Sequence, residues 1–258
     1  MEAVSKPSVH IVLVHGACHG AWCWYKLKPL LEAAGHRVTA LDLAASGIDR
    51  RSLEEVRSLA EYSQPLLELM ASLPAAEKVV LVGHSLGGMN ISLAMDMYPH
   101  KIAVAVFIAA FLPGSTPQLS DITQGEGWLD TQYIPYGSNE NPLTSMLFGP
   151  NMLSSKLYHL SSREDLELAK MLVRPSSVFH EDLSKIGALV TKEGYGSVKM
   201  AYVVCTEDKI IPESCQRSQI ETNGVDDVKV IQNADHMPMI SQPQHLCQSL
   251  LEIANTYA

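Results

Sequence analysis

Residues 83–87, Gly-His-Ser-Leu-Gly, are the stretch that decides the fold, because of the segments on either side of them. The apolar run 78–82 comes directly before and a helical pattern over 89–98 follows, so the sequence predicts a strand, a sharp turn and a helix. A serine at such a turn projects its hydroxyl above the edge of a sheet, and the flanking glycines are needed because side chains there would strike the neighbouring strand and helix. The helix N-terminus adds positive potential beside the hydroxyl. We therefore predict that Ser85 acts as a nucleophile.

Strands and helices alternate on both sides of this turn. A continuous apolar run predicts a strand at 9–14 that is buried on both faces of a parallel sheet, and further strands are predicted at 38–43, 78–82, 102–110, 198–205 and 228–232. Helical spacing predicts helices at 21–34, at 53–73 with a kink or break at Pro65, at 89–98, after Pro212 and at 243–257. Repeated βα units of this length indicate an α/β fold with a mostly parallel, doubly wound sheet.

Residues 112–196 do not continue this alternation. Prolines and glycines interrupt any long periodicity there, and only short apolar segments such as 143–148 and 166–173 remain. We expect an inserted cap of short helices, with room for a short hairpin. The core of the protein would then consist of 1–111 together with 197–258.

Composition and charge limit the kind of protein and its partners. A chain of 258 residues with 47% hydrophobic and 18% charged residues can bury one large core. The formal net charge of −9 argues against nucleic acids and anionic membranes as partners, since both would repel it. Five cysteines without a CxxC pair indicate neither a disulfide framework nor a zinc site. Residues 1–8 lack a signal-peptide core and no apolar run reaches the ~20 residues of a membrane span, so the cytoplasm is the expected location.

A serine hydroxyl needs a histidine base and an acid that orients the imidazole. In folds of this kind the chain order is Ser, then Asp or Glu, then His. Asp208 and His236 each follow one of the last two predicted strands, so both lie at the carboxyl ends of strands, where Ser85 also emerges. Glu207 is the rival acid, but it adjoins its strand more closely and is expected to be a solvated loop residue. The predicted triad is Ser85, Asp208 and His236.

Two neighbours of the triad and one thiol could be mistaken for catalytic groups. His84 and Asp235 adjoin triad residues in the sequence, so their side chains should point elsewhere, and we expect local packing or turn hydrogen bonds for them. Cys18 has no basic partner implied by its position, and no cluster of metal ligands emerges from the sequence.

The oxyanion of a tetrahedral intermediate needs two preorganised N–H donors. The backbone of Leu86, directly after the nucleophile, is the first. The second is expected in the loop after the first strand, residues 15–20, His-Gly-Ala-Cys-His-Gly, with Ala17 as the best candidate. A plain strand-to-helix turn is the alternative for this loop, but such a turn would not require so many small residues in succession.

With these residues in place, nearly the whole chain resembles the plant methylesterase branch of the α/β-hydrolases, the group that includes salicylate methylesterases, polyneuridine aldehyde esterase and hydroxynitrile lyases. The most telling stretches are LVHGACHGAWCWYKLKPLLEAAGH from Leu13, VTALDLAASGI from Val38, VLVGHSLGGMN from Val80, WLDTQYIPYG from Trp128, LVRPSSVF from Leu172, CTEDK from Cys205 and ADHMPM from Ala234. The resemblance implies an α/β-hydrolase fold and cofactor-free hydrolysis of the methyl esters of small plant hormones or specialised metabolites by the predicted triad. It also suggests a homodimer.

The resemblance also points to pocket residues and to alternative activities. The cap resembles the family's lid, so Trp128, Phe148 and Phe111 are expected to line the acyl pocket, with simple packing as the other interpretation. Hydroxynitrile lyases have threonine where this chain has Gly16, and lysine where it has Met237, which cannot stabilise departing cyanide. The esterase is therefore favoured over a lyase or an esterase-decarboxylase. A hormone-binding protein with low turnover is a further alternative.

Overall fold

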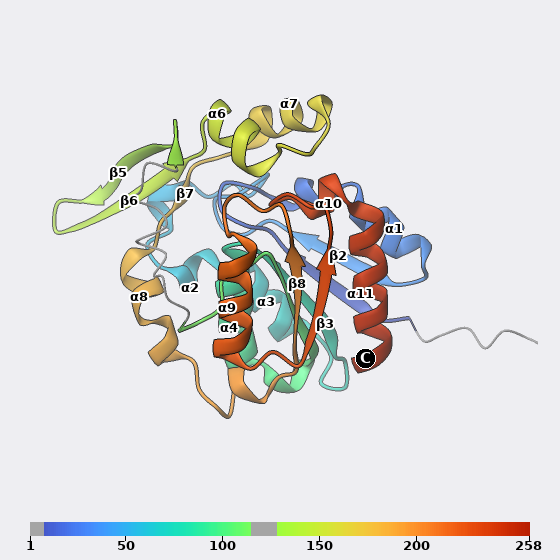
Figure 1. Ribbon diagram of the computed structural model, residues 1–258. Helices are drawn as coiled ribbons and strands as arrows, with labels where there is room; N and C mark the ends of the chain where they lie inside the picture. Colours follow the sequence, from blue (N-terminus) through green and yellow to red (C-terminus); the bar gives the residue numbers. More distant parts are fainter. Residues whose placement is uncertain (1–7, 115–127) are drawn as a thin grey trace, which may run out of the picture.

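The central feature of the protein is a parallel β-sheet (Figure 1). The computed structural model describes residues 8–114 and 128–258, and within them the sheet has six strands in the order β2-β1-β3-β4-β8-β9. The strands are β1 (His10–Val14), β2 (Arg37–Leu41), β3 (Val79–His84), β4 (Ile102–Ile108), β8 (Met200–Cys205) and β9 (Asp227–Ile231). Every neighbouring pair is parallel, which confirms the predicted α/β architecture.

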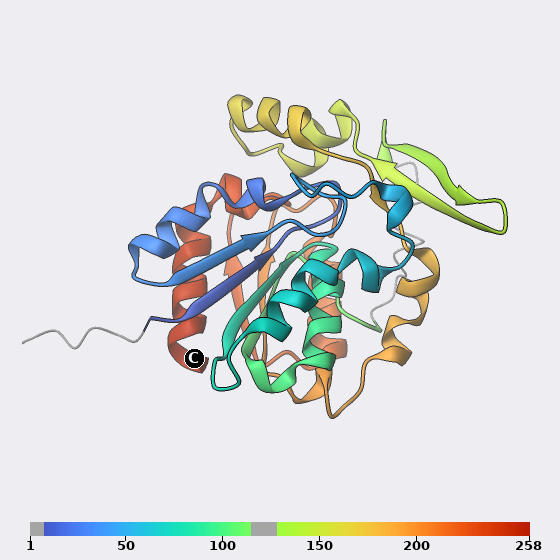
Figure 2. The same ribbon diagram turned by 180° about the vertical axis from the view of Figure 1, so that it is seen from behind.

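Helices cover both faces of this sheet (Figures 1 and 2). One face carries α1 (Leu27–Ala33) and α11 (Pro243–Tyr257), and the other carries α3 (Gln64–Ser72), α4 (Gly87–Met97) and α9 (Glu213–Asn223). All residues of β1, β3 and β8 are buried, whereas the edge strands β2 and β9 are partly exposed. The continuous apolar runs of the sequence are thus the inner strands, because helices shield them on both sides. None of the described helices is long and apolar enough to cross a lipid bilayer.

The segment 53–73, predicted as a helix with a kink or break at Pro65, is divided into three shorter pieces. These are the 3-10 turn η2 (Leu53–Glu55), α2 (Leu59–Tyr62) and α3. Ser52 forms a capping box with Glu55, and the Ser58 hydroxyl accepts a hydrogen bond from the Glu61 N–H, so each serine starts a new helical turn. Pro65 lies in the first turn of α3, where its missing N–H costs no helical hydrogen bond. The break expected at Pro65 is confirmed, and the serine caps explain the other interruption.

A second layer lies above the carboxyl ends of the strands (Figures 1 and 2). It contains a three-stranded antiparallel sheet of β5 (Gln132–Ser138), β6 (Asn141–Leu147) and β7 (Ser176–Ser177), together with α6 (Pro150–Met152), the π-helical turn η5 (Leu153–Leu157) and α7 (Arg163–Leu172). We call this layer the cap. Next along the chain, α8 (His180–Leu189) contacts the start of α2, where the Asp182 carboxylate accepts a hydrogen bond from the Leu59 N–H at 2.6 Å. The short hairpin that the sequence left open is therefore present as β5 and β6.

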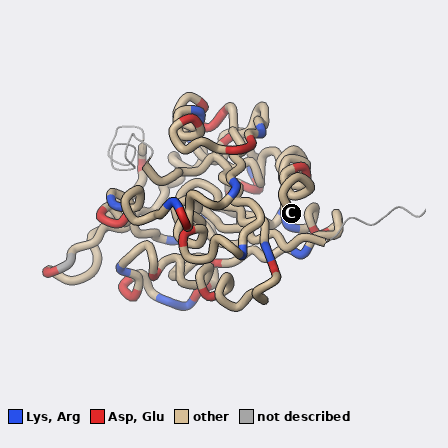
Figure 3. The backbone as a smooth tube through the Cα atoms, turned by 90° about the horizontal axis from the view of Figure 1, so that it is seen from below, with Lys and Arg blue, Asp and Glu red and all other residues tan. Residues whose placement is uncertain are grey.

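Charged residues are distributed around the outside of the molecule. Seen from below, acidic and basic positions are interspersed along the backbone and the central strands carry few of them (Figure 3). Within the part of the chain that the structure describes, acidic and basic residues therefore alternate and neither kind is confined to one segment.

Candidate active site

The turn between β3 and α4 holds Ser85 in a left-handed conformation, with a φ of 54°. This conformation costs a non-glycine residue roughly 1–2 kcal/mol, so the surrounding chain must enforce it. The turn is packed so tightly that a Cβ atom at Gly87 would lie 2.7 Å from the His15 carbonyl oxygen, and one at Gly83 would lie 2.7 Å from the Gly87 oxygen. The Phe111 N–H also donates to the Ser85 carbonyl at 3.2 Å. The glycines are therefore required by close backbone approach, as the sequence predicted.

The structure brings Ser85, Asp208 and His236 together in one hydrogen-bonded chain. His236 Nε2 lies 3.0 Å from Ser85 Oγ, and His236 Nδ1 lies 2.8 Å from Asp208 Oδ2. A carboxylate can only accept, so Nδ1 carries the proton and Nε2 is left to accept the hydrogen bond of the serine hydroxyl. All three side chains are buried. The arrangement can remove a proton from the serine oxygen.

The backbone after Asp208 fixes the orientation of its carboxylate. Asp208 Oδ1 accepts hydrogen bonds from the N–H groups of Ile210 at 2.7 Å and Ile211 at 2.9 Å, which leaves Oδ2 for the histidine. The neighbouring Glu207 is exposed, so it has the solvated position expected from the sequence. The geometry therefore favours Asp208 as the acid.

The loop that follows β1 lies against the nucleophile. A Cβ atom added to Gly16 would come within 2.8 Å of Ser85 Cβ, so the backbone next to Ala17 passes directly beside the serine. His15 fixes this loop, since its Nδ1 lies 2.8 Å from the Gly16 oxygen and its Nε2 accepts from the Leu43 N–H at 3.1 Å. Within the described residues, neither the Ala17 N–H nor the Leu86 N–H donates to a protein acceptor. Both are therefore available to an oxyanion.

Cys18, in the same loop, faces the cap. Its thiol donates to the Met146 carbonyl at 3.3 Å, and burial raises the pKa of the thiol to about 12. A thiol that stays protonated at neutral pH is a poor nucleophile. The expectation that Cys18 is not the catalytic group agrees with this environment.

His84 and Asp235, which adjoin triad residues in the sequence, form structural hydrogen bonds, some of them local and some to distant segments. His84 donates from Nε2 to the His236 carbonyl, at 2.7 Å, and so supports the backbone of the base. The Asp235 carboxylate accepts from the Met237 N–H at 2.9 Å, which is the local turn bond expected from the sequence. Asp235 also bonds to residues of the cap, which the sequence did not indicate.

Two of the predicted pocket residues, Trp128 and Phe148, contact each other next to the loop that contains His19. The rings of Trp128 and Phe148 stack with centroids 6.0 Å apart, and the Phe148 ring lies 6.3 Å from the His19 ring. Phe111 is placed beside the nucleophile by its backbone bond to Ser85. Met237 is completely buried at the start of α10 (Pro238–Ser241). His19 is a further residue of this region that sequence reasoning missed, because nothing local marks it as different from any loop histidine.

Three histidines around the site are buried and neutral. Burial lowers the pKa of His19 to about 3, and it also lowers the pKa values of His15 and His84. An unfolded histidine titrates near ~6.5, so between pH ~6.5 and ~4 the unfolded chain binds protons that the folded protein does not. In that window the stability of the fold must fall as the pH is lowered.

We expect the free energy of unfolding to decrease from pH 6.5 to 4.5 by up to about 1.4 kcal/mol per pH unit for each such histidine. Urea unfolding at constant ionic strength measures this slope. His19→Gln should make the slope shallower, and His245→Gln, at an exposed position, is the control for the substitution itself. A stability that does not vary with pH across this window would contradict the neutral burial of these side chains.

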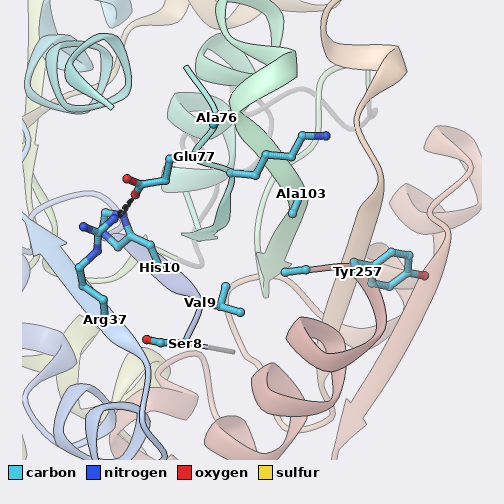
Figure 4. A pocket seen from close by; sticks show the side chains of 10 residues that line it. Ser8, Val9, His10, Arg37, Ala76, Glu77, Ala103 and Tyr257 are labelled. Atoms are coloured by element: carbon cyan, nitrogen blue, oxygen red, sulfur yellow. Dashed lines mark hydrogen bonds and ion pairs between the residues drawn. The ribbon is translucent and has the colours of Figure 1, made fainter. Parts of the chain in front are cut away.

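A separate cavity of about 630 Å³ lies at the other end of the sheet, where the strands begin (Figure 4). Its wall includes Arg37, which pairs with Glu77 and donates to His10 Nδ1 at 2.7 Å. Burial and the neighbouring Arg37 lower the pKa of His10 to about 4, so the imidazole is neutral at pH 7 and Arg37 is the ionic partner of Glu77. This cavity opens at the amino ends of the strands and is distinct from the site at Ser85.

Comparison with known proteins agrees with this geometry. Residues 11–247 match the model of the family described as "Alpha/beta hydrolase family". Salicylic acid-binding protein 2 of Nicotiana tabacum is 62% identical over 98% of this chain and 99% of its own, and methylesterase 3 of Arabidopsis thaliana is 51% identical over 96% and 97%. The crystal structure of polyneuridine aldehyde esterase superimposes with a TM-score of 0.92 at 50% identity, covering 96% of this chain and 100% of that one. The chain therefore belongs to the α/β-hydrolase family, within its plant methylesterase branch.

Proposed function

We propose that the protein is a serine carboxylesterase that hydrolyses methyl esters of small plant metabolites, with Ser85, His236 and Asp208 as its catalytic residues. The observation that carries the proposal is the continuous chain of 3.0 Å from Ser85 Oγ to His236 Nε2 and 2.8 Å from His236 Nδ1 to Asp208. Membership of the methylesterase branch supports the reaction class.

In the first half of the reaction, Ser85 Oγ attacks the ester carbonyl while its proton passes to His236 Nε2. The carbonyl oxygen becomes an oxyanion and accepts hydrogen bonds from the N–H groups of Leu86 and Ala17. When the carbonyl re-forms, the bond between the acyl carbon and the methoxy oxygen breaks. His236 Nε2 donates its proton to that methoxy oxygen, so that methanol leaves. The acyl group stays on Ser85.

In the second half, His236 takes a proton from a water molecule, whose oxygen attacks the acyl carbon. The bond to Ser85 Oγ then breaks, the serine recovers its proton from His236, and the free acid departs. Asp208 keeps the imidazole in one tautomer and stabilises the imidazolium formed in each half. The serine thus has its base, its orienting acid and its oxyanion donors within the chain itself.

The acyl group is expected to be flat and aromatic. Trp128 and Phe148 stack together over the loop of His19, and these ring faces offer a flat apolar surface to an aromatic acid. Gly16, Phe111 and the buried Met237 complete the proposed pocket around the nucleophile. A relative that is 62% identical is named for binding salicylic acid, which supports a hydroxybenzoate ester as the first substrate to test.

We also propose that residues 112–196 form the lid of this site, inserted between two parts of the core. The part of the lid that the structure describes includes the cap over the carboxyl ends of the strands, the edge from which Ser85 emerges. The five cysteines are free thiols, and this supports a reducing compartment such as the cytoplasm.

A panel of methyl esters tests the proposal. The purified protein should release methanol and free acid in equal amounts, with a higher kcat/KM for methyl salicylate than for methyl jasmonate or methyl indole-acetate. One methylene in an apolar pocket changes preference by only ~1–3 kcal/mol, so the ranking requires measured kcat/KM values for each ester. Incubation with EDTA should leave the rates unchanged. Release of cyanide from mandelonitrile by the unmodified protein, with negligible turnover of every ester, would overturn the assignment in favour of a lyase.

Retention of the acid product is a second candidate function, favoured by the name of the same relative. Titration calorimetry of salicylate into Ser85→Ala separates the two functions, since that variant keeps the pocket and loses the nucleophile. A dissociation constant for the acid far below the KM of its methyl ester would favour a binding role, and a value near or above KM would favour turnover.

A further inference from the structure

Two independent hydrogen-bond connections join one short cap segment, residues 158–161, to two different loops of the candidate active site. We propose that this segment positions both the loop 15–20, called here the oxyanion loop because it carries the Ala17 N–H, and the histidine base. The cap would then be a structural part of the catalytic machinery. The inference rests on the proposed serine esterase function, and it names positioning residues and not catalytic ones.

The first connection runs through His19 to the oxyanion loop. His19 Nδ1 lies 2.8 Å from the Ala17 carbonyl oxygen, and His19 Nε2 lies 2.7 Å from the hydroxyl of Tyr158 in the cap. A carbonyl can only accept, so Nδ1 carries the proton, and the neutral ring must then accept at Nε2 from the tyrosine hydroxyl. The result is a directed relay from Tyr158 through His19 to Ala17.

Burial keeps this relay in a single protonation state. His19 and Tyr158 are both about 2% exposed, and their rings stack at 5.9 Å. Burial holds the pKa of the tyrosine hydroxyl well above its ordinary value, so the hydroxyl remains a donor at any physiological pH. The Ala17 carbonyl is therefore held in place by hydrogen bonds that begin at Tyr158 in the cap. The peptide group that contains this carbonyl directly follows the Gly16–Ala17 peptide, whose N–H is the proposed oxyanion donor.

The second connection runs through Asp235, the residue directly before the base. Asp235 Oδ2 accepts from the Leu160 N–H at 3.0 Å and from the Ser161 hydroxyl at 3.1 Å, both in the cap. Its other oxygen accepts from the Met237 N–H at 2.9 Å and from the Ser241 hydroxyl at 2.7 Å. The carboxylate is completely buried, and these four donors take the place of the water that would otherwise solvate its charge.

The two oxygens of Asp235 thus bond to two different parts of the protein. Oδ1 fixes the turn that carries His236, and Oδ2 fixes that turn against the cap. Both the oxyanion donor and the base must be held to a fraction of an ångström, because a displacement of ~1 Å can cost on the order of 10²-fold in rate. Tyr158, Leu160 and Ser161 meet this demand from a segment more than 70 positions away from either loop in the sequence.

Tyr158→Phe tests the oxyanion connection by removing one hydroxyl. We expect kcat to fall about tenfold with KM changed less than about twofold, since the bond from the Ala17 N–H to the oxyanion, which is made only in the transition state, is weakened when Ala17 is held less firmly. The affinity of a trifluoromethyl ketone, whose adduct on Ser85 presents an oxyanion, should fall by the same factor as kcat/KM. Tyr62→Phe is the matched control, because that buried hydroxyl bonds to Ser46 Oγ at 3.1 Å instead, and its kinetics should remain within about twofold of the wild type.

Ser161→Ala and Ser161→Thr test the connection to the base. The alanine should lower kcat about threefold to tenfold, and the threonine, which keeps the hydroxyl, should restore it. Asp235→Asn should lower kcat further, because the amide keeps only one of the two oxygens and cannot accept the backbone N–H groups of Leu160 and Met237 at the same time. Ser241→Ala removes a donor that is not in the cap and should do less than Ser161→Ala. Ser161 is half-buried, so its variants provide a test that does not depend on Tyr158→Phe folding.

The outcomes separate this inference from the proposed function. Wild type and Ser85→Ala are measured in the same assay, and a wild type without Ser85-dependent turnover would overturn the esterase itself. If the wild type turns over normally while Tyr158→Phe and Ser161→Ala match its kcat and its trifluoromethyl ketone affinity, the positioning role alone is wrong. A raised KM with unchanged kcat would also overturn it, since that pattern belongs to a residue that only binds substrate.

Discussion

Replacing Ser85 by alanine should lower kcat for the best methyl ester by roughly three to six orders of magnitude, and His236→Ala should do the same, because the two form one chemical unit. The serine oxygen supplies the bond to the acyl carbon and His236 Nε2, 3.0 Å away, supplies the base. The double variant should be hardly worse than either single variant, since neither residue can perform its step alone. Single-turnover release of methanol gives the most sensitive measurement.

These losses must occur in a folded protein. Ser85 Oγ bonds only to His236 within the described residues, and both side chains, although buried, lie beyond the last residues of β3 and β9 at the end of the sheet. Circular dichroism and the urea midpoint should therefore change little in Ser85→Ala. A variant that stays folded and retains more than about one hundredth of the wild-type kcat would show that the nucleophile is elsewhere.

The features that the sequence predicted well are those with a local physical cause. Inner strands of a parallel sheet are buried on both faces, so β1, β3 and β8 read as continuous apolar runs. The turn around Ser85 needs glycines because backbones approach to less than 3 Å of where a Cβ would stand. Asp208 and His236 could be selected because residues after parallel strands share one edge of the sheet. Each inference required only a few neighbouring residues.

The features that the sequence did not predict depend on contacts between distant segments. His19 and Tyr158 are 139 positions apart, and Asp235 and Leu160 are 75 positions apart. Nothing in the residues around Asp235 distinguishes a turn carboxylate from one that also accepts two bonds from the cap. The prediction for Asp235 was therefore correct for its bond to Met237 and incomplete for the rest. Long-range polar pairing of this kind has no periodicity and leaves no local signal.

The division of the 53–73 segment has a local cause of a different kind. Leucines at helical spacing over the whole segment predicted a helix with one kink or break, at Pro65. Ser52 and Ser58 nevertheless start new turns, because each side chain satisfies an N–H group at a helix beginning. Both serines begin a Ser-x-x-Glu pattern, Ser52 with Glu55 and Ser58 with Glu61, which is the sequence signature of a helix beginning. The interruption near Ser58 therefore has a local signal, which the helical spacing of the leucines masked.

Asp208→Asn should lower kcat by about 10⁴ while leaving the shape of the site almost unchanged. Asp208 Oδ1 already accepts the N–H groups of Ile210 and Ile211, so the amide oxygen of an asparagine must occupy that position. The amide NH₂ group then faces His236 Nδ1 and donates to it, where the carboxylate accepted. Nδ1 loses its proton, Nε2 gains one, and the imidazole can no longer accept the proton of Ser85.

Glu207→Gln is the matched control, because it makes the same chemical change one position earlier on an exposed side chain. We expect it to lose less than about tenfold in kcat. A crystal structure of Asp208→Asn should show His236 still in place, and an NMR spectrum should show its proton on Nε2. Together they separate a tautomer effect from loss of structure. If Glu207→Gln were the more damaged variant, the acid would be Glu207. The reason for expecting otherwise is that, of these two acids, Asp208 is the one with two backbone donors on one oxygen, which commits its other oxygen to the histidine.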